Sequence, residues 1–359
     1  MKIGIVTYYS SHNYGAMLQA FALRKILQDL GHEATFIDYW PQHQKNIYRL
    51  FAWEDFWRRD IRGRIRYLKT FAKTLIPKLM RRKNFSHFYH DQIRPYESSQ
   101  KEEYDVIVYG SDQIWRKQGW GYGYNPVYFG KNDFKAKKHI SYAASMGALP
   151  DNAGDTETIR NLVKHIDKIS VREADLQQFL NEMGFKDVEH TIDPTFLLSK
   201  EDWKSVISKE RIIAEPYLLF YDLQGGAFDS KEISEFAKTR GLRVIRINGF
   251  APYMPTQEDR TTDGPYEFLN LVFYSDYVVT SSFHGLAFSL IFQKEFLTSL
   301  LTNRSRVKSI LESLGLSDRL LANHSSLIEV QIKEIDWSFV KRTLDEQRKE
   351  AVDFLNMVK

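Results

Sequence analysis

The sequence contains no cysteine among its 359 residues. Disulfides, thiolate metal sites and a cysteine nucleophile are therefore excluded, and the composition suits a reducing compartment. No stretch approaches the roughly 18 consecutive apolar residues of a membrane span. The opening residues, MKIGIVTYYS, predict a strand rather than a signal peptide. We therefore expect a cytoplasmic protein.

Material for a folded core is plentiful. Hydrophobic residues make up 43% of the chain, with 24 Phe and 20 Tyr, as is ordinary for globular proteins. The length exceeds that of a usual single domain, so two domains are the default expectation.

The formal net charge of +4 hides a strongly basic segment. Residues 56–83 contain eleven Lys and Arg and a single acid, Asp60. Apolar residues recur there at three- and four-residue steps, which predicts an amphipathic helix. Its basic face is either solvated, with the apolar face packed on the domain, or in contact with anionic lipid headgroups or a phosphate-rich substrate. We do not expect a nucleic-acid partner, because no recognised binding fold accompanies the charge.

Strand and helix patterns alternate along the chain, which predicts an α/β fold with parallel sheets. The expected organisation is a first Rossmann-like domain over 1–195 with the basic helical insertion at about 45–95, a second over 196–335, and a C-terminal helix over 336–359 packing back on the first domain. The first loop, SSHNYG, has one glycine, so a dinucleotide-binding fingerprint is absent.

The stretch SDYVVTSSFHGLAFSLIF, residues 275–292, is the strongest candidate site. It predicts a buried strand (Tyr277 to Thr280), a polar turn (Ser281 to Gly285) and an apolar helix from Leu286. Ligands of open α/β sheets collect at such strand ends, and helix amino ends favour anions. His284 is the side chain in this turn that can move protons near neutral pH. The alternative role for His284 is a buried histidine satisfied by a neighbour.

Other polar residues follow predicted strands, at the edge where ligands collect. Arg172 is placed to bind a carboxylate or phosphate, or to pair with a neighbouring acid. Gly110 to Asp112 offer donors and acceptors, although a tight turn would also explain them. The remaining candidates at strand ends or in the first loop are Asn13, Asn303, Arg304 and Arg306. No metal site is expected.

The ordered motifs KIGIVTYYSSHNYGAMLQAFAL, VIVYGSDQIW, ISYAASMG, SVRE, DPTFLL, SDYVVTSSFHGLAFSLIF and NRSR resemble the polysaccharide pyruvyl transferase family. The resemblance runs from residue 2 to about residue 320. It implies a glycosyltransferase-B-like (GT-B) fold, two Rossmann-like domains facing a cleft. It also implies transfer of pyruvate from phosphoenolpyruvate to a sugar of a cell-surface glycan, giving a cyclic ketal without a metal or nicotinamide cofactor.

The resemblance also implies roles for particular residues. His284 matches the family's essential histidine, and Arg172 matches an arginine that holds phosphoenolpyruvate. Ser282 and Phe283 match positions that line the donor, and the helix amino end after Gly285 adds to anion binding.

The sequence departs from the best-characterised branch of the family at Ser282, where that branch has Arg. Arg304 or Arg306 is the expected replacement for this charge.

The first domain's contribution is expected to be acceptor placement by Asn13, Ser111 and Asp112. The acceptor implied by the family is a glycan or a lipid-linked oligosaccharide. A lipid-linked acceptor would be compatible with the alternative in which the basic helix contacts the inner membrane face. Two alternatives stay open: a GT-B sugar-nucleotide glycosyltransferase and a non-catalytic glycan-binding protein.

Overall fold

The structure is a computed structural model. It describes residues 1–119, 121–223, 225–248, 258–300, 304–322, 326–327, 330 and 332–356. The candidate Asn303 lies outside the described residues, and of Arg304 only the backbone is described, as the first residue of a helix.

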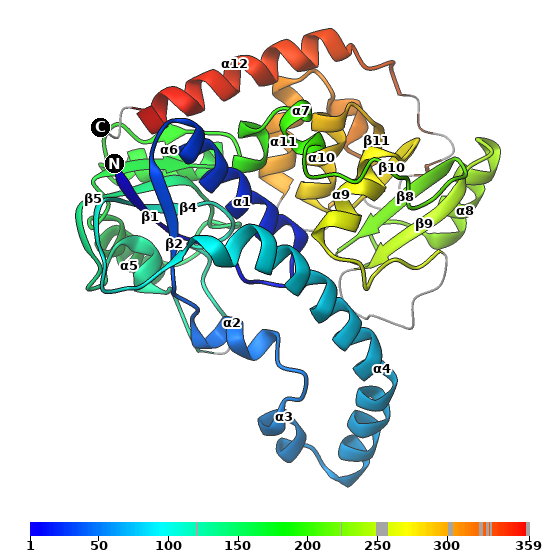
Figure 1. Ribbon diagram of the computed structural model, residues 1–359, viewed down its shortest axis with the longest axis horizontal. Helices are drawn as coiled ribbons and strands as arrows, with labels where there is room; N and C mark the ends of the chain where they lie inside the picture. Colours follow the sequence, from blue (N-terminus) through cyan, green and yellow to red (C-terminus); the bar gives the residue numbers. More distant parts are fainter. Residues whose placement is uncertain are drawn as a thin grey trace.

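The first half of the chain forms a seven-stranded sheet in the order β3-β2-β1-β4-β5-β6-β7, with every neighbouring pair parallel (Figure 1). Its central strands are buried on both faces, which explains their apolar, β-branched sequences. The strands are β1 (Lys2–Val6), β2 (Glu33–Ile37), β3 (Glu97–Ser98), β4 (Glu103–Gly110), β5 (Lys135–Ala144), β6 (Lys168–Val171) and β7 (Glu189–His190). The helices that accompany them are α1 (Tyr14–Asp29), α5 (Ala153–Val163) and α6 (Ala174–Glu182).

A second, four-stranded parallel sheet follows in the order β11-β10-β8-β9. Its strands are β8 (Tyr217–Asp222), β9 (Arg243–Asn248), β10 (Tyr277–Thr280) and β11 (Glu295–Thr298). The helices of this half are α8 (Ser230–Thr239), α9 (Pro265–Phe273), α10 (Phe283–Phe292) and α11 (Arg304–Ser313). Two parallel α/β sheets confirm the predicted fold class.

The boundary predicted for α10 is wrong by one helical turn. The helix begins at Phe283, not at Leu286, because Ser282 is its N-cap and the Ser282 hydroxyl accepts from the Gly285 N–H at 3.4 Å. His284 therefore lies in the first turn of a helix rather than in a free loop.

An apolar cluster joins the two halves of the molecule. Tyr14 of α1 stacks on Phe268 of α9 with ring centroids 4.6 Å apart. The Tyr14 hydroxyl donates to the Asp263 carbonyl at 2.7 Å. Trp203 packs on both Phe21 and Phe288, at 5.6 and 4.9 Å between centroids. Trp203 lies in α7 (Lys200–Lys204), which follows the short helical turn η4 (Pro194–Leu197).

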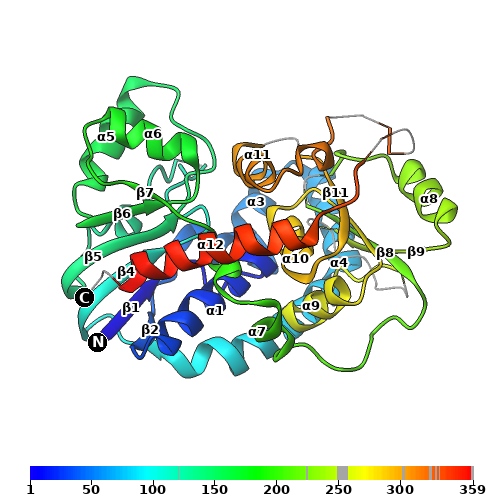
Figure 2. The ribbon, with the colours of Figure 1, turned by 90° about the horizontal axis from the view of Figure 1, so that it is seen from above.

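The last helix, α12 (Trp337–Asn356), runs across both halves (Figure 2). Its Phe354 ring lies 6.1 Å from that of Tyr142 in β5, and the Arg348 Nε donates to the Phe196 carbonyl at 2.8 Å. The remaining short turns are η1 (Tyr89–Ile93), η2 (Arg94–Tyr96), η3 (Pro126–Phe129) and η5 (Ser317–Arg319).

The basic segment forms an arm that projects from the body (Figure 1). It comprises α3 (Trp53–Arg58) and α4 (Ile61–Phe88), after the short α2 (Gln42–Ile47). The prediction of an amphipathic helix whose apolar face packs on the domain is wrong for the outer part of α4. Ile61, Ile65 and Leu68 are exposed, and the buried residues of α4 are Thr74, Pro77, Phe85 and Phe88.

Candidate active site

His284 lies where the amino ends of two helices meet. It is in the first turn of α10, and its imidazole rests against the backbone of Gly15 in the first turn of α1. A Cβ at Gly15 would lie 2.0 Å from the His284 Nδ1, so only glycine permits this approach. The imidazole side chain is 10% exposed.

Asp193 links His284 to the first half of the molecule. Its carboxylate is fully buried, and Oδ2 lies 3.7 Å from the His284 Nε2 and accepts from the Arg172 guanidinium. The same carboxylate accepts from the Ser111 hydroxyl at 3.3 Å, and from Thr195 through N–H at 3.0 Å and hydroxyl at 2.8 Å. Burial alone would raise the pKa of Asp193, but the interactions with His284 and Arg172 outweigh it and hold this pKa well below its ordinary value. Asp193 is therefore a buried carboxylate anion.

Two guanidinium groups flank the Phe283 ring. The Arg172 guanidinium carbon lies 5.1 Å from the ring centroid, and that of Arg306 lies 5.3 Å from it. Arg172 follows β6, whereas Arg306 comes from α11 of the other half. The Arg306 Nε lies 3.5 Å from the Glu173 Oε1, which also accepts from the Ser145 hydroxyl.

The charges of this cluster influence one another strongly. Burial would lower the pKa of Arg172, but the carboxylates of Asp193 and Glu173 outweigh it and raise this pKa. Burial, followed by the charge of Arg172, lowers the pKa of Arg306 to about 10. Both guanidinium groups therefore stay charged at neutral pH.

Several buried polar atoms of the cluster make no hydrogen bond within the described residues. They are Arg172 Nε and Nη2, Glu173 Oε2, His284 Nε2 and Arg306 Nε. Buried donors without acceptors are uncommon in folded proteins and call for a specific explanation. A bound anion would satisfy those on the two arginines.

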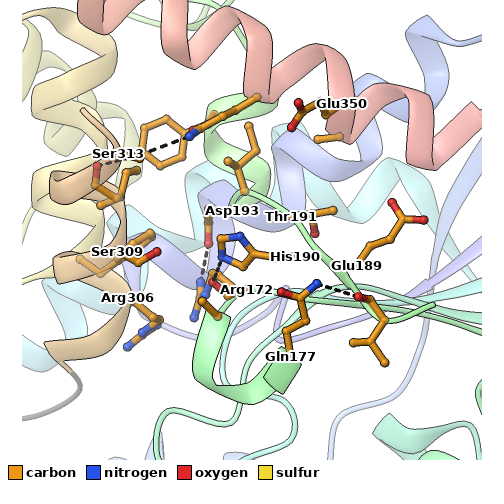
Figure 3. A pocket seen from close by; sticks show the side chains of 18 residues that line it. Arg172, Gln177, Glu189, His190, Thr191, Asp193, Arg306, Ser309, Ser313 and Glu350 are labelled. Atoms are coloured by element: carbon orange, nitrogen blue, oxygen red, sulfur yellow. Dashed lines mark hydrogen bonds and ion pairs between the residues drawn. The ribbon is translucent and has the colours of Figure 1, made fainter. Parts of the chain in front are cut away.

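A cavity of about 610 Å³ adjoins this cluster (Figure 3). Arg172, Asp193, Phe283 and Arg306 line it, with residues of α6, the segment after β7, α11 and α12 completing the walls. Its volume is in the usual range for small-molecule sites. The cavity is thus built from both halves of the chain.

The predicted residues after β4 hold a strained backbone. Ser111 and Asp112 have φ of 37° and 59°, and Ala143 near the end of the adjacent β5 has φ of 46°. Such conformations are costly for residues other than glycine and cluster at functional sites. Ser111 reaches the charge cluster through its hydroxyl, while the Asp112 carboxylate accepts from the next N–H, that of Gln113, at 2.8 Å.

Three other candidates, Asn13, Gly110 and Gly285, contribute to helix capping or helix packing. The Asn13 side chain caps α1 by accepting from the Ala16 N–H at 3.1 Å. A Cβ at Gly110 would lie 2.5 Å from Leu23 of α1, so this glycine serves helix packing. A Cβ at Gly285 would lie 2.3 Å from the Thr280 Oγ1, so Gly285 allows α10 to lie close to β10.

The sequence analysis missed three residues of this site. It named a fourth, Arg306, only as an alternative to Arg304. Asp193, Glu173 and Gly15 lie within the motifs DPTFLL, SVRE and KIGIVTYYSSHNYGAMLQAFAL, but none of them was singled out as a site residue. The strand-end position of Arg172 and Glu173 was the available signal for Glu173. Nothing in the sequence signals that Gly15 faces a histidine 269 positions later.

Two tests on the described part of the chain bear on other classes of function. No group of three or more His, Cys, Asp or Glu there is arranged to hold a metal ion. No helix there is both long and apolar enough to cross a membrane.

Solved structures with a similar overall arrangement include nucleotide-sugar enzymes. The UDP-GlcNAc 2-epimerase of Methanocaldococcus jannaschii is 12% identical, with 100% of this chain and 99% of that chain covered and a TM-score of 0.47. The UDP-N-acetylglucosamine 2-epimerase of Rickettsia bellii is 8% identical (99% and 98% covered, TM-score 0.47). The glycosyltransferase SsfS6 of Streptomyces sp. SF2575 is 13% identical (100% and 99% covered, TM-score 0.39). Identities this low do not identify a substrate.

The sequence itself is more informative. Comparison with curated proteins gives no match. The family model of polysaccharide pyruvyl transferases, however, matches residues 13–299, a span that contains His284, Arg172, Asp193 and the strands β2 to β11. This chain belongs to the polysaccharide pyruvyl transferase family.

Proposed function

We propose that the protein transfers pyruvate from phosphoenolpyruvate to two hydroxyls of a sugar in a cell-surface glycan, forming a cyclic ketal. One observation carries the proposal. Two buried guanidinium groups with unsatisfied N–H donors flank Phe283, and the neighbouring residue is a histidine held against a carboxylate. This arrangement suits a small, multiply charged anion that must gain a proton.

Arg172 and Arg306 are the proposed ligands of the donor's carboxylate and phosphate. Charge-assisted hydrogen bonds to oxyanions are among the strongest in proteins, and the amino end of α10 adds a favourable dipole. Arg306 is also the proposed replacement for the arginine that the best-characterised branch has at the position of Ser282. Ser282 caps α10 through its hydroxyl, and the second positive charge beside Phe283 is supplied by α11.

His284 is the proposed proton carrier. Protonation of the donor's C3 makes C2 electrophilic, one sugar hydroxyl adds to C2, and the C2–O bond to phosphate breaks. The second hydroxyl then adds to C2. Of the two hydroxyl protons, one balances the proton taken up by C3 and the other leaves with inorganic phosphate. His284 acts as the acid for C3 or as the base for a hydroxyl. Asp193, 3.7 Å from Nε2, is the proposed group that holds the imidazole in position.

The acceptor is proposed to be a glycan or a lipid-linked oligosaccharide, placed by the first half of the chain. Asn13, Ser111 and Asp112 are the proposed contacts. The strained backbone at Ser111 and Asp112, and the bond from Ser111 to Asp193, support a functional role for this edge of the first sheet.

The test is to incubate the purified protein with phosphoenolpyruvate and a panel of glycans, following phosphate release and the mass of each acceptor. We expect phosphate release that depends on one class of acceptor and is lost in His284→Ala. His165→Ala is the matched control, because His165 is exposed in the other half of the chain. Phosphate release at the wild-type rate by His284→Ala would contradict the role of this histidine. Turnover of a nucleotide sugar in place of phosphoenolpyruvate would contradict the proposed reaction.

A further inference from the structure

The arm of α3 and α4 exposes a continuous apolar seam. Residues of α4 at steps of four and three positions form it, and Ile61, Ile65 and Leu68 are 74%, 50% and 46% exposed. Such spacing places side chains in one row along a helix. The members of the seam are Ile61, Ile65, Leu68, Ala72, Leu75 and Leu79. Soluble surfaces rarely leave an apolar row of this length uncovered.

The seam is not the face that attaches α4 to the rest of the protein. Phe51 packs on Tyr67 and Phe71 of α4 at 5.1 and 5.0 Å between ring centroids. Nearer the body, Phe85 packs on Tyr14 at 4.9 Å. At 100° per residue these three residues of α4 lie on a different side of the helix from Ile61, Ile65 and Leu68. The helix is therefore apolar on two sides, and the outer one has no partner within the described residues.

Positive charge borders the seam along its length. Residues 56–83 carry eleven Lys and Arg against the single acid Asp60, which caps the start of α4. The exposed bases of α4 are Arg62, Arg66, Lys69, Lys73, Arg82 and Lys83. Two further acids, Glu54 and Asp55, lie in the first turn of α3. An apolar strip edged by bases is typical of helices that lie in the interface of an anionic membrane.

Two tryptophans strengthen this comparison. Trp53 and Trp57 of α3 are 61% and 60% exposed. The helix α3 lies next to the outer end of α4 (Figure 1). Tryptophan is enriched where proteins enter the headgroup region of a bilayer. Arg64 of α4 stacks on Trp57 with 4.8 Å from its guanidinium carbon to the ring.

A second copy of the same arm is a poorer partner. In a coiled coil built on this seam, the flanking positions would be four bases and two apolar residues, without an acid: Arg62, Arg64, Lys69, Lys78, Phe71 and Ile76. Bases would then face bases across the interface, which opposes self-association. An anionic lipid surface satisfies both the apolar seam and its basic borders.

We propose that the arm of α3 and α4 is a membrane-docking element that inserts its seam and tryptophans among anionic lipid headgroups. The inner end of α4 is hydrogen-bonded to the body of the protein, so docking of the arm would fix the orientation of the active site relative to the membrane. Arg81 donates to the His12 carbonyl at 3.3 Å and to the Thr261 carbonyl, and Asn84 donates to the Thr262 carbonyl at 3.0 Å. These bonds hold α4 to both halves, close to Gly15 and therefore to His284. The inference concerns location and does not depend on the proposed reaction.

The experiment is flotation of the purified full chain with vesicles of neutral lipid alone or of neutral lipid mixed with an anionic lipid. We expect flotation with the mixed vesicles at low salt and its loss in 1 M salt, where screening extends to about 3 Å. Each base near the surface is worth about a fivefold change in partitioning, so Arg62→Gln with Lys69→Gln should weaken binding roughly thirtyfold. Trp53→Ser with Trp57→Ser should also weaken it.

The matched control is Lys186→Gln with Lys231→Gln, which removes the same charge from exposed positions outside the arm and should leave flotation unchanged. Absence of flotation with mixed vesicles at low salt would overturn the proposal. So would equal weakening by the control pair, which would point to net charge alone. Light scattering tests the alternative that the seam binds a second copy of the chain. A dimer that depends on the arm and does not float with vesicles would support that alternative and overturn the proposal.

Discussion

Substitution of Gly15 by alanine tests the contact on which the position of His284 depends. The added Cβ would lie 2.0 Å from the His284 Nδ1, 2.3 Å from Cε1 and 2.4 Å from Cγ. Ordinary contact begins at 3.4 Å, so the imidazole must move by about 1.4 Å or the two helices must separate. Both responses displace the proposed proton carrier from Asp193.

The expected magnitudes separate activity from stability. A misplacement of about 1 Å in a catalytic group costs about a hundredfold in rate, so we expect Gly15→Ala to lower kcat by at least that factor. Alanine is about 1 kcal/mol better than glycine within a helix, whereas overpacking costs about 1–3 kcal/mol. The free energy of unfolding should therefore fall by no more than about 2 kcal/mol.

The assay is phosphate release from phosphoenolpyruvate with an active acceptor, alongside urea unfolding. Gly154→Ala is the matched control, since Gly154 also occupies the second position of a helix capped by asparagine and is exposed. A Cβ there meets an atom only at 3.5 Å. If Gly15→Ala keeps more than half of the wild-type kcat, the reasoning about His284 is refuted.

Three further predictions concern stability. Asp193→Asn leaves buried cations unpaired and should lower the free energy of unfolding by about 3–5 kcal/mol at pH 7. Because the folded-state pKa of Asp193 is depressed, the wild-type advantage in urea unfolding should persist above pH 4 and shrink below it; an advantage that grows in acid would contradict the pairing. Burial raises the pKa of Asp263 to about 6, so this group should make the free energy of unfolding of the wild type decline between about pH 4 and 6. Asp263→Asn should remove that decline, and parallel pH profiles of the two proteins would contradict this prediction. Gly285→Ala places a Cβ 2.3 Å from the Thr280 Oγ1 and should cost about 1–3 kcal/mol, with an unchanged Tm in calorimetry as the opposing result.

Local patterns in the sequence were sufficient to predict the α/β class and the strand that precedes His284. The run Tyr277 to Thr280 forms a strand as predicted, because buried parallel strands need continuous apolar residues. The start of α10 was misplaced by three residues. Ser282 was read as part of a turn, whereas its hydroxyl caps the helix.

The site depends on contacts between residues far apart in the chain, which a single sequence does not reveal. Arg172 was identified from its place after a strand, but its partner Asp193 lies 21 residues away and its second neighbour, Arg306, lies in the other half. Gly15 gave no sign of its contact with His284. The contacts of Arg306 and Gly15, unlike the pair of Arg172 with Asp193, form between the two halves of the chain.

The arm shows what the spacing of apolar residues can predict and what it cannot. The spacing of Ile61, Ile65 and Leu68 correctly predicts a helix, but it says nothing about what covers the apolar side. Packing of this side on the domain was one of the two alternatives, and the structure leaves these side chains exposed.

A crystal structure of the protein soaked with phosphoenolpyruvate tests the central claim most directly. We predict the donor beside Phe283, with its carboxylate and phosphate oxygens about 3 Å from nitrogens of Arg172 and Arg306, and His284 facing its C3. Donor bound elsewhere, or bound beside Phe283 without contact to either arginine, would contradict the account.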